Sequence, residues 1–423
     1  MIKIMKRGEV SESELFARKV SGADVAGTVA EIIADVRQNG DAALRKYNEK
    51  FDKCTCGSLE VSEEEFAAAM AAVPAEYLRV LERSAGNIRE YHLRQVRHDY
   101  IVTAEDGSVL GQRVLPMARV GLYVPGGTAA YPSSVLMNCI PAKIAGVGEI
   151  VMTTPASGGE VSPAILAAAK VAGVDRVFKV GGAQAVAALA YGTESVPRVD
   201  KIVGPGNAFV AEAKRQVYGQ VAIDMIAGPS EILIVSDGKT NAKWLAADML
   251  SQAEHDKLAT AILITDSAAL AAEVAEEIER QLAALPREEI ARASIENNGK
   301  IIVAGDLEDA VAIANEIAPE HLELCVDAPF DYLGKVKNAG SIFLGRYSPE
   351  PVGDYLAGTN HTLPTMGTAR FSSPLSVDDF VKKSCFSYYT PAALEAAADD
   401  IALFADAEGL HGHAVSATIR REG

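Results

Sequence analysis

The most constraining feature of the sequence is a repeated alternation between short Val/Ile-rich runs and Ala-rich stretches that follow a glycine. The first series of runs follows Arg119 and covers residues 120–124, 149–153, 176–180 and 201–203. Parallel strands need a long crossover connection, usually a helix, so this alternation is typical of βαβ units. We therefore predict a parallel sheet with helices packed on it.

A second series of apolar runs begins after Gly228-Pro229-Ser230. Its strands are predicted at residues 232–235, 260–265, 300–303, 322–326 and 341–344, with helices such as 241–253 and 270–285 between them. A chain of 423 residues is too long for one hydrophobic core. The expected fold class is α/β, with two Rossmann-like α/β domains of similar build, although no residue-level repeat demonstrates a duplication.

The two ends of the chain lack this alternation. Residues 25–95 have a helical pattern, in which Ser62 and Glu65 are spaced as a capping box. Beyond Arg346 a Pro/Gly/Ser-rich region precedes a helix-compatible tail, which is too small to bury much surface alone and should pack on another domain or subunit. We predict a helical N-terminal segment partly packed on the second α/β domain, two α/β domains and an extended/helical tail, at residues 1–115, 116–228, 229–370 and 371–423.

Charge and composition limit the partners and the compartment. The formal net charge is −17 and the basic residues are scattered, so neither nucleic acid nor a membrane surface is expected as a partner. No apolar run has the length of a membrane span, and the N-terminus turns acidic before a signal peptide could form, so we expect a cytoplasmic protein. The five cysteines include no CxxC pair and are expected to be reduced and structural, with the Cys54-Thr-Cys56 spacing incidental.

Three predicted strands of the first series end in glycine-rich turns, although the dinucleotide fingerprint GxGxxG is absent. The turns are Tyr123-Val-Pro-Gly-Gly, Gly181-Gly-Ala-Gln184 and Gly204-Pro-Gly-Asn207. Backbone N–H groups and the helix dipole favour an anionic ligand where a strand passes into a helix. Each turn can equally be an ordinary connection, and the spacing alone does not name a ligand.

Candidate metal ligands gather in the second half of the chain. Gln252 and His255 stand at positions i and i+3 near the end of a predicted helix, so they share a face and can bind one ion, or they form a polar helix end. The stretch from Asp354 to His361 and the stretch from Glu408 through His411 to His413 lie in Gly-containing, bendable regions. A mixed nitrogen and oxygen set without thiolate suits zinc or manganese with positions left open for a substrate.

Glu320 and His321 are neighbours where a predicted helix gives way to a strand. Histidine titrates near neutral pH, so His321 can take the proton of an alcohol while hydride leaves to a nicotinamide, and a carboxylate can then activate water. The alternative is a solvated loop pair with no chemical role.

Together these stretches resemble the histidinol dehydrogenase family, and the similarity runs from the helical N-terminal region to the tail. It rests on nine motifs: GLYVPGG (121–127), VGGAQAVAALAYGT (180–193), KIVGPGNAFV (201–210), AGPSE (227–231), DMLSQAEHD (248–256), APEHLEL (318–324), AGTNHTLPT (357–365), ARFSSPLSVDDF (369–380) and EGLHGHA (408–414).

The resemblance implies one zinc per subunit and an NAD site. The zinc ligands would be Gln252, His255, Asp354 and His413, with the tail histidine supplied by the partner in a domain-swapped homodimer. The NAD contacts would be Tyr123, Gln184 and Asn207. Histidinol would be contacted by the zinc ligands, by His321 and by Ser230, His361 and Glu408.

The resemblance also implies the reaction, the last step of histidine biosynthesis. L-histidinol would be oxidised to L-histidine through L-histidinaldehyde, with two hydrides transferred to NAD. His321 would accept the alcohol proton and Glu320 would activate the water that adds to the aldehyde, while the zinc positions the imidazole and amino nitrogens of the substrate. Three alternatives remain: a relative that oxidises another small hydroxy compound such as a sulfonated diol, a zinc hydrolase, and a non-catalytic metal-binding protein.

Overall fold

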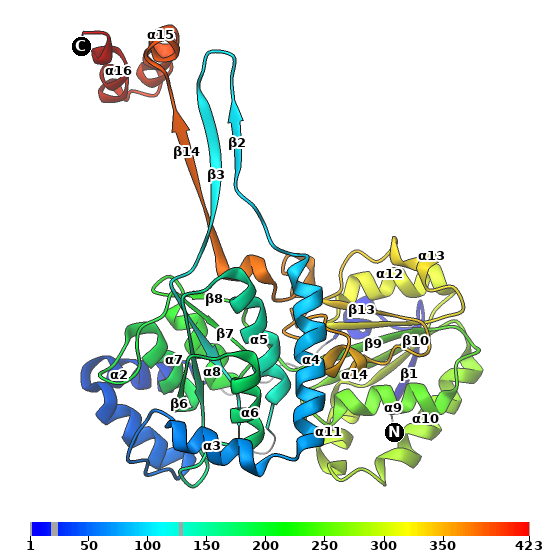
Figure 1. The fold of residues 1–423 in the computed structure, drawn as a ribbon. Helices are drawn as coiled ribbons and strands as arrows, with labels where there is room; N and C mark the ends of the chain where they lie inside the picture. The colour runs from blue at the N-terminus through cyan, green and yellow to red at the C-terminus, as the bar shows by residue number, and fades with distance from the viewer. Residues whose placement is uncertain (1, 18–23, 127–129, 423) are drawn as a thin grey trace.

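Two parallel sheets lie side by side, each covered by helices, and a slender arm rises from the body (Figure 1). The computed structural model describes residues 2–17, 24–126 and 130–422. The turn residue Gly127 therefore lies outside the described part of the chain. The expected α/β class with two Rossmann-like sheets is confirmed.

The first sheet has five parallel strands in the order β6-β5-β4-β7-β8. They are β4 (Arg119–Tyr123), β5 (Glu149–Thr154), β6 (Arg176–Lys179), β7 (Lys201–Val203) and β8 (Ala222–Ile223). The helices that connect and cover them are α5 (Pro132–Ala145), α6 (Pro163–Ala172), α7 (Gly182–Tyr191) and α8 (Ala208–Val217). Numbered from β4, this order is 3-2-1-4-5, which matches the first five positions of the 3-2-1-4-5-6 order of dinucleotide-binding sheets, where ligands bind at the carboxyl ends of the strands.

The second sheet has six parallel strands in the order β1-β11-β10-β9-β12-β13. They are β1 (Lys3–Lys6), β9 (Glu231–Ser236), β10 (Thr260–Thr265), β11 (Lys300–Val303), β12 (His321–Cys325) and β13 (Ser341–Leu344). Its helices are α9 (Ala242–Ala253), α10 (Ala268–Leu282), α11 (Glu288–Asn298), α12 (Leu307–Ile317), α13 (Phe330–Leu333) and α14 (Glu350–Tyr355).

The central strands are apolar because they are buried on both faces. Every residue of β9 and of β10 is buried, including polar side chains at the strand ends. Helices on both faces of a parallel sheet leave no solvated side, so the strand sequence reads as a continuous Val/Ile/Leu run. The nine predicted strands are confirmed to within a residue at either end.

The N-terminal segment supplies helices to both halves. They are α1 (Glu12–Leu15), α2 (Ala26–Tyr47), the π-helical turn η1 (Asn48–Asp52), α3 (Glu63–Ala72) and α4 (Ala75–Leu93). The predicted capping box is confirmed, since Ser62 and Glu65 bond each other's backbone N–H at the start of α3. Helix α4 stands between the two sheets (Figure 1), and its Ser84 and Asn87 donate hydrogen bonds to the backbone carbonyls of Tyr355 and Leu356.

The arm is a three-stranded antiparallel sheet in the order β14-β3-β2. It consists of β2 (Tyr100–Thr103), β3 (Val109–Pro116) and β14 (Val381–Tyr388), and it carries α15 (Pro391–Ala407) and α16 (His411–Thr418) at its tip. Short 3-10 turns lie at η2 (Thr368–Arg370), η3 (Val377–Phe380) and η4 (Ile419–Arg421). Sequence periodicity predicted the tail helices but not the strands of the arm.

One expectation about the cysteines is wrong. Cys54 and Cys56 form a disulfide, whereas Cys139 and Cys325 are free and buried and Cys385 is free and exposed. The Cα atoms of the two cysteines lie 5.7 Å apart, a distance that a disulfide spans. A spacing of two residues in the sequence does not show whether the two side chains point toward each other.

Candidate active site

The predicted site residues of the second half lie at the amino edge of its sheet. His321 opens β12, Ser230 directly precedes β9, and Gln252 and His255 stand at the end of α9, which runs back to this edge. The candidate residues of the first half follow the carboxyl ends of β4, β6 and β7. The two sheets therefore contribute opposite edges.

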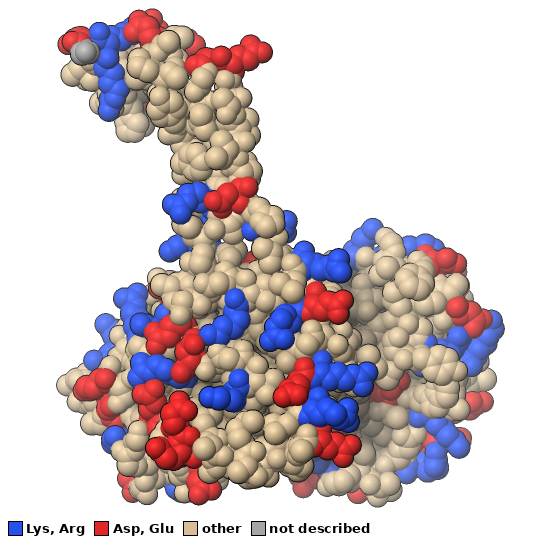
Figure 2. All heavy atoms as spheres, viewed as in Figure 1, with Lys and Arg blue, Asp and Glu red and all other residues tan. Residues whose placement is uncertain are grey.

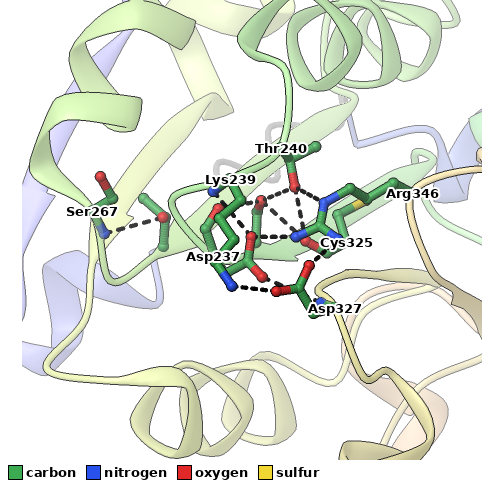
Figure 3. Close-up of polar contacts among 9 residues, drawn as sticks. Asp237, Lys239, Thr240, Ser267, Cys325, Asp327 and Arg346 are labelled. Atoms are coloured by element: carbon green, nitrogen blue, oxygen red, sulfur yellow. Dashed lines mark hydrogen bonds and ion pairs between the residues drawn. The ribbon is translucent and has the colours of Figure 1, made fainter.

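The carboxyl edge of the second sheet is closed by its own side chains. The Arg346 guanidinium bonds the carboxylates of Asp237 and Asp327 and the hydroxyl of Thr240, which in turn donates to the carbonyl of Cys325 (Figure 3). This is the edge at which parallel sheets usually bind ligands. In this sheet the hydrogen-bond donors and acceptors at that edge are bonded to one another.

A residue with a left-handed backbone conformation directs the chain into Glu320 and His321. Ala318 ends α12 with φ 50°, and the chain then turns through Pro319 into β12. The His321 Nδ1 lies 2.9 Å from the carbonyl oxygen of Glu231, so Nδ1 carries the proton and donates it. The other ring nitrogen, Nε2, is buried without a hydrogen-bond partner among the described residues, so its lone pair is available as a base.

Burial sets the protonation of both members of this pair. The pKa of His321 is lowered to about 4 by burial, against the charge of Asp354, so the imidazole is neutral at neutral pH. Burial raises the pKa of Glu320 well above its usual range, although its Oε2 accepts a hydrogen bond from the backbone N–H of Glu231 at 2.8 Å. The predicted solvated loop pair is thereby excluded, because both side chains are buried.

A set of nitrogen and oxygen donors surrounds the pair. Asp354 Oδ1 lies 3.3 Å from His361 Nδ1, and the negative charge of Asp354 acts on the pKa of both His321 and His255. Gln252 is buried, and its Oε1 has no partner among the described residues. Desolvation lowers the pKa of the His255 imidazole, against the charge of Asp354. Short distances and electrostatic interaction thus join four of the predicted residues, namely His255, His321, Asp354 and His361.

Glu350 belongs to the same group but was missed from the sequence. Its Oε1 lies 3.8 Å from His321 Nε2, and ligand atoms of His321, Glu350 and Asp354 all lie within 4.8 Å of one another. Burial and the charge of Asp354 raise the pKa of Glu350 to about 9. Glu350 and Asp354 share a face of α14 because they are four residues apart, and that spacing was the available signal.

Ser134 of the first half was also missed. Its hydroxyl lies 3.3 Å from His361 Nε2. Ser134 is buried in the first turn of α5, directly after the Gly-rich turn that follows β4. His361 therefore joins the first half of the chain to the acidic group around Asp354.

The three Gly-rich turns differ in how their polar side chains are used. The Tyr123 hydroxyl accepts a hydrogen bond from the Gly182 N–H at 3.1 Å, and burial raises the pKa of that phenol to about 12. Both amide atoms of Gln184 are buried without a partner among the described residues. Asn207 is the N-cap of α8, because its Oδ1 accepts from the N–H groups of Phe209 and Val210.

Two of these turns need glycine because the chain packs closely there. A Cβ on Gly204, where φ is 115°, would lie 2.1 Å from the Tyr123 carbonyl oxygen, and one on Gly182 would lie 2.7 Å from Gln184 Oε1. A larger residue at either position would displace the backbone or the amide that borders the turn. The carboxyl edge of the first sheet thus holds buried polar atoms without a partner among the described residues, those of the Gln184 amide, unlike the bonded network at the same edge of the second sheet.

Within one chain, the tail does not reach this site. Glu408 and His413 are exposed at the tip of the arm, away from the body that holds the other predicted residues (Figure 1). His413 lines a cavity formed by the tail itself with Leu394, Ile401 and Arg420 among its walls.

Known proteins match the chain along its whole length. A family model described as histidinol dehydrogenase matches residues 17–421. Histidinol dehydrogenases of Clostridium acetobutylicum and Bacillus cereus are 53% and 58% identical, over 99% and 93% of this chain and 99% and 92% of theirs. The crystal structure of the enzyme from Elizabethkingia anophelis matches with a TM-score of 0.95 at 38% identity, covering 100% of this chain and 98% of that one.

Proposed function

This chain belongs to the histidinol dehydrogenase family, an oxidoreductase family of histidine biosynthesis, and we propose that it oxidises L-histidinol to L-histidine with zinc and NAD. The observation that carries the proposal is the buried His321 imidazole. Its Nδ1 is held by a backbone carbonyl, while Nε2 is left as an unpartnered base among the described donors and acceptors.

NAD fits the carboxyl edge of the first sheet. We propose contacts from Tyr123, Gln184 and Asn207. In support, Gln184 offers two buried amide atoms without a partner among the described residues, and the amide nitrogen of Asn207 is not used in capping α8. NAD supplies the hydride acceptor for both oxidations.

The donor set around Asp354 fits zinc. We propose that Gln252, His255 and Asp354 hold it together with His413 of the partner subunit. The unpaired buried oxygen of Gln252 and the mixed nitrogen and oxygen donors without thiolate agree with this assignment. Bound there, zinc supplies a fixed positive centre that orients the imidazole and amino nitrogens of histidinol.

The chain's own residues move the protons. In the first oxidation His321 Nε2 accepts the hydroxyl proton as the carbinol carbon loses a hydride, which leaves histidinaldehyde. In the second, Glu320 takes a proton from the water that adds to the aldehyde, and the hydrate loses its hydride to give the carboxylate. The burial of Glu320 and His321 keeps other water out, which prevents loss of the aldehyde between steps.

The proposal includes a homodimer that shares its sites. Ser230 and His361 of one chain and Glu408 of its partner would contact histidinol. In support, the arm and the tail expose large apolar side chains such as Ile101, Phe404 and Leu403, and the middle of the arm is largely uncharged in Figure 2. Exposed apolar surface of this extent marks an interface.

The proposal also assigns a role to each part of the chain. Residues 116–228 would bind NAD, residues 229–370 would carry the zinc ligands and the catalytic pair, and residues 371–423 would cross to the partner. No described helix is both long and apolar enough to span a bilayer. We propose a cytoplasmic enzyme.

The test measures how many NADH molecules are formed for each histidinol consumed. Purified zinc-loaded protein is supplied with L-histidinol and NAD, and the NADH formed is counted against the histidinol consumed. Two NADH per histidinol, lost on chelation and restored by zinc, is the expected result. One NADH would indicate release of the aldehyde, and none would favour a diol substrate, tested next, or zinc-dependent hydrolysis.

A further inference from the structure

The first sheet lacks the acidic side chain that dinucleotide-binding folds place after their second strand. In this sheet β4 is the first strand and β5 the second. Strand β5 ends in Thr153 and Thr154, whose buried hydroxyls have no partner among the described residues, and residues 155–159 contain no carboxylate. In such folds that acidic residue accepts a hydrogen bond from the ribose of the adenosine half.

A carboxylate reaches the same edge from a different part of the chain. The turn η1, which ends in Asp52, is seated on β6, because Asn48 Nδ2 donates to the carbonyl of Lys179 at 2.6 Å. Farther along, the Lys179 N–H donates to the carbonyl of Leu59 at 2.7 Å, and Glu60 pairs with Phe178. The segment is therefore tied to the last residues of β6 on both sides of Asp52.

Asp52 is half-buried, and one oxygen of its carboxylate is enclosed without a partner among the described residues. Its Oδ2 is buried and makes no hydrogen bond among the described residues, and the same holds for Asn48 Oδ1 and for the amide of Gln184. The charge of Asp52 acts on the Tyr123 phenol, so the two side chains lie near each other. An enclosed carboxylate oxygen without a hydrogen-bond donor is unfavourable, and a ligand hydroxyl would supply that donor.

We propose that Asp52 binds a hydroxyl of the adenosine ribose of NAD and thereby selects NAD over NADP. The inference rests on the proposed NAD dependence. Helix α2, which leads into η1, lies on the side of the first sheet away from the second sheet (Figure 1). In the proposed reaction the hydride leaves next to His321, at the second sheet, so the nicotinamide end of NAD would lie on that side and the adenosine end near Asp52. A 2′-phosphate would meet the carboxylate as a like charge.

The test compares Asp52→Asn with Glu49→Gln, a matched change of an exposed carboxylate in the same turn. The cofactors are NAD, NADP and NAD without the 2′-hydroxyl of its adenosine ribose. In wild type, loss of that hydroxyl should raise KM about tenfold or more. Asp52→Asn should raise KM for NAD to a similar extent, more than it lowers kcat, and should not raise KM for NADP. Glu49→Gln should behave as wild type.

The outcomes separate this inference from the proposed function. Wild-type protein that forms no NADH from histidinol overturns both. Wild-type protein that forms NADH but uses the 2′-deoxy cofactor equally well overturns the inference alone, and this comparison needs no variant. An Asp52→Asn enzyme with the KM values of Glu49→Gln, or with equal losses for NAD and NADP, also overturns it.

Discussion

A buried ion pair supports the third Gly-rich turn, and its removal should weaken both the fold and the proposed NAD site. The side chains of Lys214 and Asp224 are 3% and 1% exposed and bond each other. Lys214 Nζ also donates to the Gly204 carbonyl at 3.0 Å, and the Gly204 N–H donates to Asp224 Oδ2 at 2.8 Å. The pair thus holds both backbone polar groups of one glycine.

Lys214→Met would leave the Asp224 carboxylate buried and unpaired, which costs about 3–5 kcal/mol. With a urea dependence of about 2–3 kcal/mol/M, the unfolding transition of the first sheet should move down by about 1–2.5 M. The control is Lys257→Met, whose partner Glu289 and own side chain are 85% and 55% exposed. Such a surface pair contributes below about 1 kcal/mol, so its transition should barely move.

Two measurements decide the point. Unfolding is followed in urea for both variants and for Lys214→Met/Asp224→Asn, which should be more stable than the single variant because no charge is left buried. KM for NAD should rise in Lys214→Met and stay at the wild-type value in Lys257→Met. The reasoning is refuted if the two single variants unfold at the same urea concentration, or if the double variant is the least stable.

Three further predictions address the chemistry, the dimer and the disulfide. Glu320→Gln should still form NADH in the first oxidation but lose most of the second, since water activation by a general base contributes about 10²–10⁴-fold; histidine formed at the wild-type rate would contradict this. Inactive His321→Asn and His413→Asn proteins, unfolded and refolded together, should regain roughly a quarter of wild-type activity, because half of the dimers then hold one intact site; no recovery would mean that each tail serves its own chain. Denatured protein without reductant should show three thiols per chain, and five would mean that Cys54 and Cys56 are reduced.

The two α/β layers could be predicted because their signal is local. A parallel strand buried on both faces is a short apolar run, and the helix that follows begins at a glycine or a capping residue, so periodicity locates both. The buried run of β9 and the capped start of α3 are examples. Neither the apolar run of β9 nor the capped start of α3 depends on which strands pair in the sheet.

The arm could not be predicted in this way. Strands β3 and β14 pair from Val109↔Tyr388 to Pro116↔Val381, across more than half of the chain, and no local pattern encodes that pairing. All residues of β2 and most of β14 are exposed, so the inward and outward alternation that marks a half-buried strand is absent. Strand β1 was missed because it has four residues and only one buried side chain, so its sequence shows no alternation.

The site was predicted where side-chain chemistry is unusual and missed where it is common. Two patterns attract notice in the sequence: a histidine next to a glutamate, and a glutamine three residues before a histidine. In the structure the charge of Asp354 acts on both His321 and His255. Glu350 and Ser134 are ordinary residue types whose burial only the fold reveals. The roles of the predicted residues and the domain boundaries stay predictions.

The use of opposite edges of the two sheets follows from what fills each edge. Arg346 and its carboxylate partners close the carboxyl edge of the second sheet, so this half has no room for a second dinucleotide there. Its amino edge instead presents Glu320 and His321 next to a carboxylate-rich helix, and Ser134–His361 connects that edge to the first sheet. A cofactor on the first sheet and a metal on the second can then act on one substrate between them. A substitution that opens the Arg346 network should therefore lower stability without creating a second NAD site.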